Sequence, residues 1–183
     1  MLIGATLIIA GGVMATTKQY PVAVVDWNWV SAKDFEIVRG ASEQFYTSAF
    51  VTYGKVAPSG AEKEKLHIEI TRATLDRLIE ELLVRNEAEQ EVESLQSKIA
   101  EKIKSVDSQK LQNPVREMYG LGIDEFRRRV LEPQALQELL AATLAATGDS
   151  LTARIIALKK AARVILLFPG LLWTENGVEL KSK

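Results

Sequence analysis

The chain is most constrained near its start, where a strand, a turn and a capped helix follow one another over residues 22–35. Residues 22–25 form an apolar run that predicts a short strand, and Asp26-Trp27-Asn28 is a turn candidate. Trp29-Val30 predicts a second strand, so that the segment forms a small β-hairpin. Ser31 is a good N-cap for the helix that follows, and Asp34 three residues later makes a weaker version of the capping box.

Helical periodicity dominates the next part of the chain. Apolar residues at three- and four-residue steps predict a helix over residues 31–54 and a second helix over about residues 61–90. The second helix is the clearest in the sequence, because the face opposite its apolar stripe is densely charged. A further apolar stripe covers residues 92–106, followed by a polar connection over residues 107–113. Asn113-Pro114 predicts the start of another helix, with proline at the first helical position.

Two more helices are expected in the last third of the chain. Gly120 and Gly122 mark a turn, and the periodicity after it predicts a helix over about residues 124–147. Pro133 lies inside this helix and is expected to interrupt or kink it, because proline has no N–H to donate. Residues 150–167 predict the last helix.

The resulting prediction is an all-α domain over residues 22–168, with five or six helices and a small N-terminal β-hairpin. Residues 169–183 are expected to form a tail that carries Trp173 and a turn at Glu175-Asn176-Gly177. Trp173 is expected either to lie at a membrane interface or to cover the end of the domain.

The apolar segment before the first strand is treated separately. Residues 2–17 carry no charge, and as a helix they would span about 24 Å, slightly less than the roughly 30 Å hydrocarbon core of a bilayer. The segment fits a membrane helix with a missing or very short cytoplasmic flank, a signal-like anchor or cleaved signal peptide, or a buried core helix, and no basic n-region precedes it. We expect an apolar membrane-anchor helix over residues 1–17 and a linker over residues 18–21, with the polar bulk after Lys18 on the extracytoplasmic side.

Composition and motifs leave little room for catalysis or for a cofactor. The 23 basic and 24 acidic residues are mixed, without the basic stripe and interleaved aromatics of a nucleic-acid-binding protein. The chain has no cysteine, which excludes disulfides, thiol catalysis and cysteine-based metal sites, and His67 alone cannot form a zinc site. Phosphate-binding loops and nucleophile elbows are absent. Glu80-Glu81 and Arg127-Arg128-Arg129 are expected to be solvated helix faces, so we predict no catalytic residue, no metal ligand and no cofactor.

Three stretches of the chain, residues 22–35, 75–88 and 118–127, together resemble one family in their order and spacing. This family is the N-terminal chaperone domain of SurA-type proteins, the module that usually precedes parvulin prolyl isomerase domains. Residues 22–35 are similar to the family's opening, where a strand reaches an Asn-Gly turn and then a helix. Residues 75–88 are similar to its most recognisable helix, a Leu-x-x-Leu-Ile-x-x-x-Leu run, and residues 118–127 resemble the turn before the closing helix. The resemblance covers residues 22 to about 146, and none of the three stretches is specific by itself.

The chain departs from the family's pattern at two places. Asp26-Trp27 replaces the usual Asn-Gly, and Trp27 disfavours the positive backbone angles of a tight primed turn, so a wider loop is expected. Residues 162–167 faintly resemble the first strand of a parvulin domain, with Val164 where the histidine would be. The sequence from there to Lys183 is far too short for that domain. The resemblance therefore implies peptide binding and does not imply isomerase activity.

Exposed aromatic side chains are the candidates for peptide binding. A chaperone needs apolar surface that stays exposed, because unfolded clients are recognised by their own unburied side chains. Phe45 and Tyr53 fit the inward stripe of the first predicted helix. Tyr46 and Phe50 lie off this stripe. The candidate peptide-binding residues are Tyr46, Phe50, Met118 and Tyr119. The alternative is that these side chains pack against the hairpin or the last helix.

Together, the resemblance and the uncharged segment 2–17 lead us to expect a membrane-tethered, extracytoplasmic, ATP-independent holdase. Its partners would be unfolded or nascent extracytoplasmic polypeptides, together with a lipid bilayer bound through residues 2–17. Two other functions stay open at this point. One is a helical scaffold or adaptor that docks a folded partner at the membrane, and the other is the front half of a parvulin foldase whose catalytic domain would follow Lys183. The oligomeric state is open as well.

Overall fold

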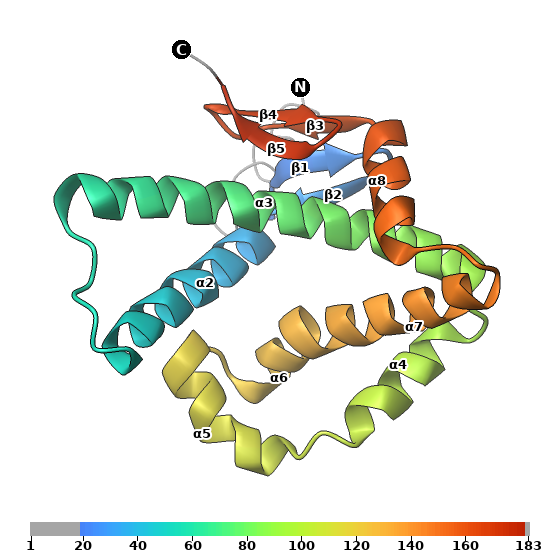
Figure 1. Ribbon diagram of the computed structural model, residues 1–183, viewed down its shortest axis with the longest axis horizontal. Helices are drawn as coiled ribbons and strands as arrows, with labels where there is room; N and C mark the ends of the chain where they lie inside the picture. The colour runs from blue at the N-terminus through green and yellow to red at the C-terminus, as the bar shows by residue number, and fades with distance from the viewer. Residues whose placement is uncertain (1–18, 182–183) are drawn as a thin grey trace, which may run out of the picture.

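The helix α3 (Gly60–Glu91) runs across the molecule, and the other elements pack on its two sides (Figure 1). The computed structural model describes residues 19–181, and the anchor expected over residues 1–17 lies outside the described residues. Strands lie on one side of α3, and most of the helices lie on the other (Figure 1). The described chain is mostly helical, as predicted. In chain order the elements are β1 (Pro21–Val25), β2 (Asn28–Ser31), α2 (Ala32–Thr52), α3, α4 (Leu95–Lys104), α5 (Ser108–Tyr119), α6 (Ile123–Phe126), the π-helix η1 (Arg127–Leu131), α7 (Glu132–Ala146), α8 (Leu151–Ala161), β3 (Val164–Leu166), β4 (Leu171–Thr174) and β5 (Gly177–Leu180).

The first two predicted helices are confirmed. The predicted cap starts α2, since the Ser31 hydroxyl oxygen accepts a hydrogen bond from the Asp34 N–H at 3.0 Å. The helix α3 is 32 residues long, and Leu75 and Ile79 of its apolar stripe are fully buried. These two helices were the most strongly periodic segments, which is why their bounds agree with the sequence to within one or two residues.

The N-terminal hairpin is confirmed, but its turn is tighter than predicted. Val25 pairs with Asn28, so Asp26 and Trp27 alone form the loop between β1 and β2. Asp26 adopts the left-handed conformation, at φ 52°, which its short polar side chain tolerates. Asp26 has the positive φ angle of this turn, and Trp27 does not. The bulky side chain of Trp27 is therefore compatible with a two-residue turn.

The predicted helix over residues 150–167 is wrong at its C-terminal end. The helix α8 ends at Ala161, and the following apolar run forms β3, which pairs antiparallel with β1 to give a three-stranded sheet in the order β2-β1-β3. Ile165 lies opposite Val24, and the Leu167 N–H donates to the Val22 carbonyl oxygen at 2.9 Å. This run becomes a strand because the free edge of β1 offers unpaired backbone groups and β-branched residues favour extended structure.

The segment after Pro169 is not a tail, because it folds onto α3 as the hairpin β4-β5. The predicted turn is present, with Thr174 paired to Gly177. Leu171 and Val178 are buried in the core. Both backbone polar groups of Val178 are bonded by side chains of α3: the Arg72 guanidinium donates to its carbonyl at 2.8 Å, and the Asp76 carboxylate accepts from its N–H at 3.0 Å.

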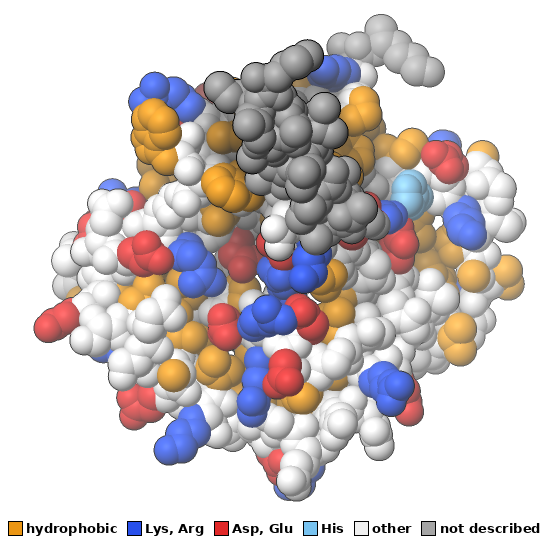
Figure 2. Space-filling model, turned by 180° about the vertical axis from the view of Figure 1, so that it is seen from behind, with side chains coloured by type: hydrophobic (Ala, Val, Ile, Leu, Met, Phe, Trp, Pro, Cys, Tyr) orange, Lys and Arg blue, Asp and Glu red, His pale blue; other side chains and the backbone are white. Residues whose placement is uncertain are grey.

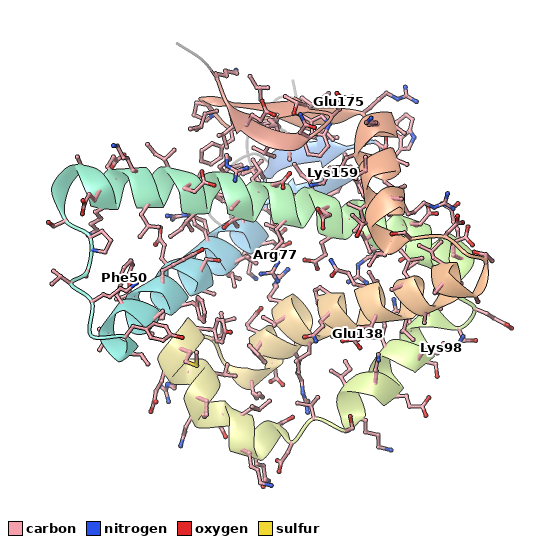
Figure 3. All side chains as sticks on the ribbon, viewed as in Figure 1. Phe50, Arg77, Lys98, Glu138, Lys159 and Glu175 are labelled. Atoms are coloured by element: carbon pink, nitrogen blue, oxygen red, sulfur yellow. The ribbon has the colours of Figure 1, made fainter. Side chains whose placement is uncertain are left out.

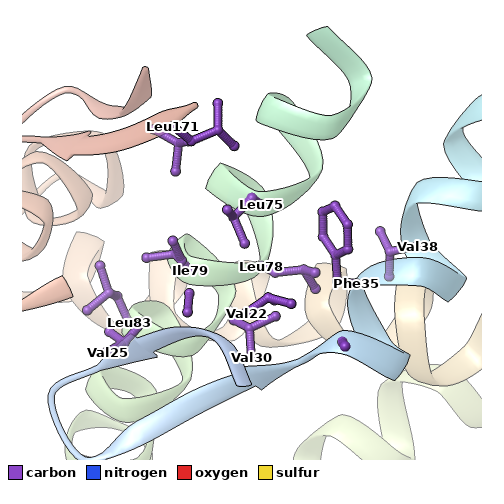
Figure 4. Close-up of a cluster of buried hydrophobic side chains, with 13 residues drawn as sticks. Val22, Val25, Val30, Phe35, Val38, Leu75, Leu78, Ile79, Leu83 and Leu171 are labelled. Carbon is purple, nitrogen blue, oxygen red and sulfur yellow. The ribbon is translucent and has the colours of Figure 1, made fainter. Parts of the chain in front are cut away.

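The buried side chains form three hydrophobic clusters. The first lies between the β1-β2 hairpin, the start of α2, the middle of α3 and β4, as Figure 4 shows for Phe35, Leu75 and Leu171. The second joins the C-terminal half of α3 to α4 and α7, and includes Val84 and Leu140. The third and smallest joins α5 and α6 to one side of α2. Because α2 and α3 each contribute to two of these clusters, they connect the strands to the helices α4 to α7.

The predicted start of a helix at Asn113-Pro114 is wrong. The helix α5 begins earlier, at Ser108, and carries Pro114 in its interior. Its cap is Asp107, whose carboxylate accepts hydrogen bonds from the N–H groups of Gln109 and Lys110. Asp107 is a strong N-cap residue and lies at the start of what the sequence suggested was a polar connection.

The helix is not broken at Pro133, but it is π-helical in the turn before this residue. The segment runs from α6 through one π-helical stretch, η1, into α7, without a loop. In an α-helix, residue 133 would donate its N–H to the Arg129 carbonyl, which proline cannot do. The Arg77 guanidinium of α3 donates to that carbonyl oxygen instead, at 2.6 Å.

Candidate functional site

The helix α2 is buried at its start and exposed at its end. Its buried residues, Ala32, Phe35 and Val38, all lie in the first two turns of the helix. Beyond Gly40 every residue of α2 is half-buried or exposed. The aromatic side chains of the second half of α2 therefore lie at the molecular surface.

An aromatic groove lies between the second half of α2 and the α5–η1 region. The rings of Phe45 and Tyr119 stack with their centroids 5.3 Å apart, and Tyr46 meets Phe45 edge-on at 6.0 Å. Such geometries are the favoured ones for aromatic pairs. The groove has a volume of about 230 Å³ and is lined by Val38, Ala41, Ser42, Phe45, Tyr46, Arg77, Tyr119, Leu121, Arg129 and Val130.

Two guanidinium groups, those of Arg77 and Arg129, line the aromatic groove. Arg77 extends from α3 into the space between α3 and the α6–α7 segment (Figure 3). Arg129 is fixed by two carboxylates, pairing with Asp34 at the start of α2 and with Glu125 at 3.4 Å. The groove thus combines aromatic walls with two guanidinium groups, whose remaining N–H groups can donate hydrogen bonds to the carbonyl oxygens of a bound peptide.

A second groove, the α2–α3 groove, lies on the other side of α2. It has a volume of about 470 Å³ and is lined by Gly40, Glu43, Gln44, Thr47, Phe50, Ala57, Pro58, Lys63, Leu66, His67 and Ile70. Phe50 enters it from α2 (Figure 3), opposite Leu66 and Ile70 of α3. Its rim is polar, and this is where the pale blue histidine lies in Figure 2.

The single histidine has a structural partner. His67 Nδ1 lies 2.8 Å from Glu43 Oε1, and the same oxygen accepts from Arg39 at 2.7 Å. This exposed pair links α2 to α3 at the mouth of the α2–α3 groove. Within residues 19–181 no cluster of three His, Asp or Glu side chains is arranged to hold a metal ion.

The end of α2 and the loop to α3 expose further large apolar side chains. Val51 is 74% exposed, Tyr53 77% and Val56 92%. Tyr53 was predicted to face inward, which is wrong, because the last turn of α2 extends past the elements that cover its beginning. We call the set Tyr46, Phe50, Val51, Tyr53 and Val56 the α2 apolar surface.

The four predicted peptide-binding residues do not share one pocket. Tyr46 and Tyr119 line the aromatic groove, and Phe50 lines the α2–α3 groove. Met118 is 42% exposed on α5 and is not among the residues that line either groove. The helix α5 is held against α2 at this point. Gln44 and Ser48 of α2 both donate to the carbonyl oxygen of Glu117, each at 3.2 Å.

Sequence reasoning missed several residues of this region. Leu66 and Ile70 belong to the apolar periodicity that predicts a helix over residues 61–90, but they also line the α2–α3 groove. Val51 and Val56 flank Gly54, which ends the helix, so their exposure follows from the helix end and not from any periodic pattern.

The charged runs contact neighbouring elements more than predicted. Arg127 donates to Ser108 of α5, and Arg128 pairs with Glu125 one turn earlier. Glu80 pairs with Lys159 of α8 at 2.8 Å. These side chains, which were expected to be solvated helix faces, therefore bind η1 to α5 and α8 to α3.

Glu81 of α3 and Lys159 of α8 are among the ionisable groups whose pKa is shifted by their surroundings. Burial raises the pKa of the Glu81 carboxyl above its ordinary value, and the nearby guanidinium groups oppose this shift only in part. Burial would lower the pKa of Lys159, but hydrogen bonds and charges from Glu80 and Asp76 raise it above its ordinary value. Neither group lines the aromatic groove or the α2–α3 groove, so these shifts concern stability and not the candidate site.

Comparisons with protein-family models, with curated proteins and with solved structures found no match to this chain. Among residues 19–181 no single helix has both the length and the hydropathy to cross a membrane, although the segments Ile123–Ala146 and Leu151–Ala161 pass together as a pair bent by 106°.

Proposed function

We propose that this protein is a membrane-tethered, extracytoplasmic holdase that binds non-native polypeptides reversibly without ATP. The observation that carries the proposal is the exposure of the α2 apolar surface. All of its side chains except Phe50 are 45% to 92% exposed, and they lie along one helix end, between two grooves with apolar walls. Apolar surface of this kind marks an interaction site in a folded domain.

The shape of this surface fits an unfolded chain better than a folded partner. The two grooves lie on opposite sides of α2, so a client that bound both would have to bend around the exposed end of the helix. An unfolded polypeptide can do this, and it presents single apolar side chains to each groove. Val51, Tyr53 and Val56 would contact the client between the grooves.

The expected affinity follows from the area available. Burying one large apolar side chain contributes about 1.5–3 kcal/mol, so two or three anchors give roughly 3–9 kcal/mol before the entropy of association is subtracted. Because the entropy of association reduces this gain, the range sets an upper limit on affinity, and we expect dissociation constants of micromolar or weaker. Weak binding is what a holdase requires, because it must release its client without chemistry.

The tether is supported by the sequence before the first strand. Residues 2–17 contain no charged side chain and precede β1 directly, with only residues 18–20 between them. A segment of this length and composition fits a membrane anchor. The extracytoplasmic side is inferred from the resemblance to SurA-type chaperone domains.

The proposal is tested by binding of one polypeptide in two states. The full chain, reconstituted in lipid nanodiscs, is titrated against a fluorescently labelled secretory protein that has been reduced and alkylated so that it stays unfolded. We expect saturable binding of the unfolded form and no binding of the native form of the same protein. Binding of the folded form alone would favour an adaptor and contradict the holdase.

A pair of variants assigns the binding to the α2 apolar surface. The double variant Y53S/V56S removes two exposed side chains, so the free energy of unfolding should change by less than about 0.5 kcal/mol. We expect it to weaken client binding about tenfold, which corresponds to about 1.4 kcal/mol. The matched control is I156S, which removes a 49% exposed side chain from α8 and should leave client binding unchanged.

A further inference from the structure

The sheet β2-β1-β3 has an apolar outer face. Trp29, Val24 and Ile165 lie opposite one another on the three strands, in register. Side chains in register on neighbouring strands point to the same face of a sheet. The neighbouring positions Ala23 and Val25 are fully buried toward the core, so the row of three faces away from it. Trp29 is 60% exposed and Ile165 62%.

Further large side chains extend this face at its edges. Tyr20 is 47% exposed just before β1, Leu167 is 54% exposed just after β3, and Trp27 at the hairpin tip is 94% exposed. Figure 2 shows hydrophobic side chains in the upper part of the rear view, where the strand layer lies. We call Tyr20, Val24, Trp27, Trp29, Ile165 and Leu167 the outer sheet face.

The position of this face along the chain limits what can cover it. Its central strand, β1, begins at Pro21, three residues after the uncharged segment 2–17 gives way to Lys18. Three residues span at most about 11 Å when fully extended. The headgroup region of a bilayer is about 5–8 Å thick on each side. A chain anchored through residues 2–17 therefore keeps the start of β1 within reach of the headgroup region, and the outer sheet face begins there.

The chemistry of the face fits that location. Tryptophan and tyrosine prefer the boundary between headgroups and acyl chains, where an apolar ring and a polar N–H or O–H are both satisfied. The hairpin tip also lies beside a cationic residue, Arg163, whose backbone N–H donates to the Asp26 carboxylate at 3.3 Å. Arg163 is thereby placed near Trp27, as in interfacial surfaces that combine basic and aromatic side chains.

We propose that the outer sheet face docks on the lipid headgroup boundary and fixes the orientation of the whole domain on the membrane. The proposal rests on the tether in the proposed function. Because α2 begins next to β2 and leads away from the strand layer over 21 residues (Figure 1), the α2 apolar surface lies up to about 30 Å from the sheet. Docking in this way leaves the client-binding surface facing away from the bilayer.

Tryptophan fluorescence of the full chain in lipid vesicles tests the proposal. Phosphatidylcholine and phosphatidylglycerol vesicles are prepared with or without bromine on the acyl chains near the headgroups, which quenches nearby tryptophan. The variant W173F reports Trp27 and Trp29, and the control W27F/W29F reports only Trp173, which packs against the core. We expect at least about twofold stronger quenching in W173F than in the control, with emission shifted to shorter wavelength.

The outcomes separate docking from tethering. If the chain floats with the vesicles but bromine does not quench Trp27 and Trp29, the docking proposal is wrong and the tether stands. If the chain does not float with vesicles, both are wrong. In a chain that does not float, emission at short wavelength at every protein concentration means that residues 2–17 cover the face. With or without flotation, unquenched emission whose shift grows with protein concentration means that a second copy covers it.

Discussion

Gly177 lies against the carboxylate of Asp76, where the C-terminal hairpin packs on α3. Its φ is +118°, in the region that favours glycine, and a Cβ at this position would overlap the Asp76 carboxylate. The close approach lets Asp76 accept from the Val178 N–H while it also pairs with Lys159 at 3.3 Å. One glycine and one carboxylate therefore fix the hairpin β4-β5 in place.

The variant G177A is expected to destabilise the protein by about 1–3 kcal/mol, through backbone strain and displacement of the Asp76 carboxylate. Urea unfolding followed by circular dichroism measures this change. The control is G122A, because Gly122 has a negative φ and open space around its Cβ position, so its free energy of unfolding should change little. Equal effects of the two variants would contradict the account of Gly177.

The half-buried Glu81 makes stability depend on pH in a defined direction. Because burial raises its pKa in the folded state, Glu81 keeps its proton in the folded protein at pH values where the unfolded chain has lost it. Its contribution to stability therefore falls as pH rises from the ordinary glutamate pKa through the raised folded value. E81Q mimics the protonated form, so its free energy of unfolding relative to wild type should increase as pH rises from about 4 to 7.

The control for Glu81 is a carboxyl group whose pKa is shifted the other way. Hydrogen bonds from Lys102 and Gln134 lower the pKa of Glu138, so its contribution is present above the unfolded pKa and is lost as pH falls through the lower folded value. E138Q should therefore lose stability relative to wild type as pH rises, by a small amount because the group is exposed. Urea titrations of both variants at several pH values measure the two trends, and trends of equal sign would refute the assignment.

The α6–η1–α7 segment shows how one element can depend on a side chain from another. Pro133 leaves the Arg129 carbonyl without its helical donor, and Arg77 of α3 donates to it. We expect R77M to cost about 1 kcal/mol, since it leaves this acceptor without its donor. In a P133A background, residue 133 regains an N–H, so R77M should cost less. A double-mutant cycle in urea measures the coupling, and an additive result would contradict it.

The elements that the sequence predicted best were those whose signals are local. Ser31 and the strong periodicity of residues 61–90 placed the starts of α2 and α3 to within a residue or two. The apolar run after Ala161 was assigned to a helix because periodicity cannot separate a short buried strand from the end of a helix. Its conformation is decided by β1, which lies near the opposite end of the chain. The periodicity of this run does not contain that information.

The sequence predicted individual residues of the candidate site, but it did not predict which of them lie together. Tyr46 and Phe50 were selected because they lie off the inward stripe of α2, and both do lie at the surface of grooves. That these two residues serve grooves on opposite sides of α2 depends on how α3 and α5 pack against the helix. Tyr119 stacks on Phe45 because α5 packs against α2, and these two helices are far apart in the sequence. The sequence alone therefore could not predict this contact.

At the scale of the whole molecule, the two ends of the described chain form one core. Val22 and Val25 of β1 pack with Leu171 and Val178 of the C-terminal hairpin, and β3 completes the sheet. A chain that ends at Ala161 would lose β3 and the hairpin together and expose the first hydrophobic cluster. We therefore expect the N-terminal strands to need the C-terminal residues in order to fold.

This dependence predicts a sharp effect of truncation. The chain ending at Ala161 is expected to retain helical circular dichroism but to lose its cooperative urea transition, because β1 and α3 lose their buried partners. The control chain, ending at Lys181, retains every described strand and should unfold with the wild-type midpoint. A cooperative transition in the shorter chain would show that the C-terminal hairpin is dispensable.

The central claim is that the folded chain holds non-native polypeptides on the α2 apolar surface. Light scattering tests it most directly: an outer-membrane-type protein is diluted from denaturant into buffer that contains the full chain in nanodiscs at several molar ratios, without nucleotide. We predict that aggregation is suppressed near stoichiometric ratios by wild type and by I156S, and much less by Y53S/V56S. Unchanged aggregation in the presence of the wild-type chain, shown by circular dichroism to be folded and helical, would contradict the account.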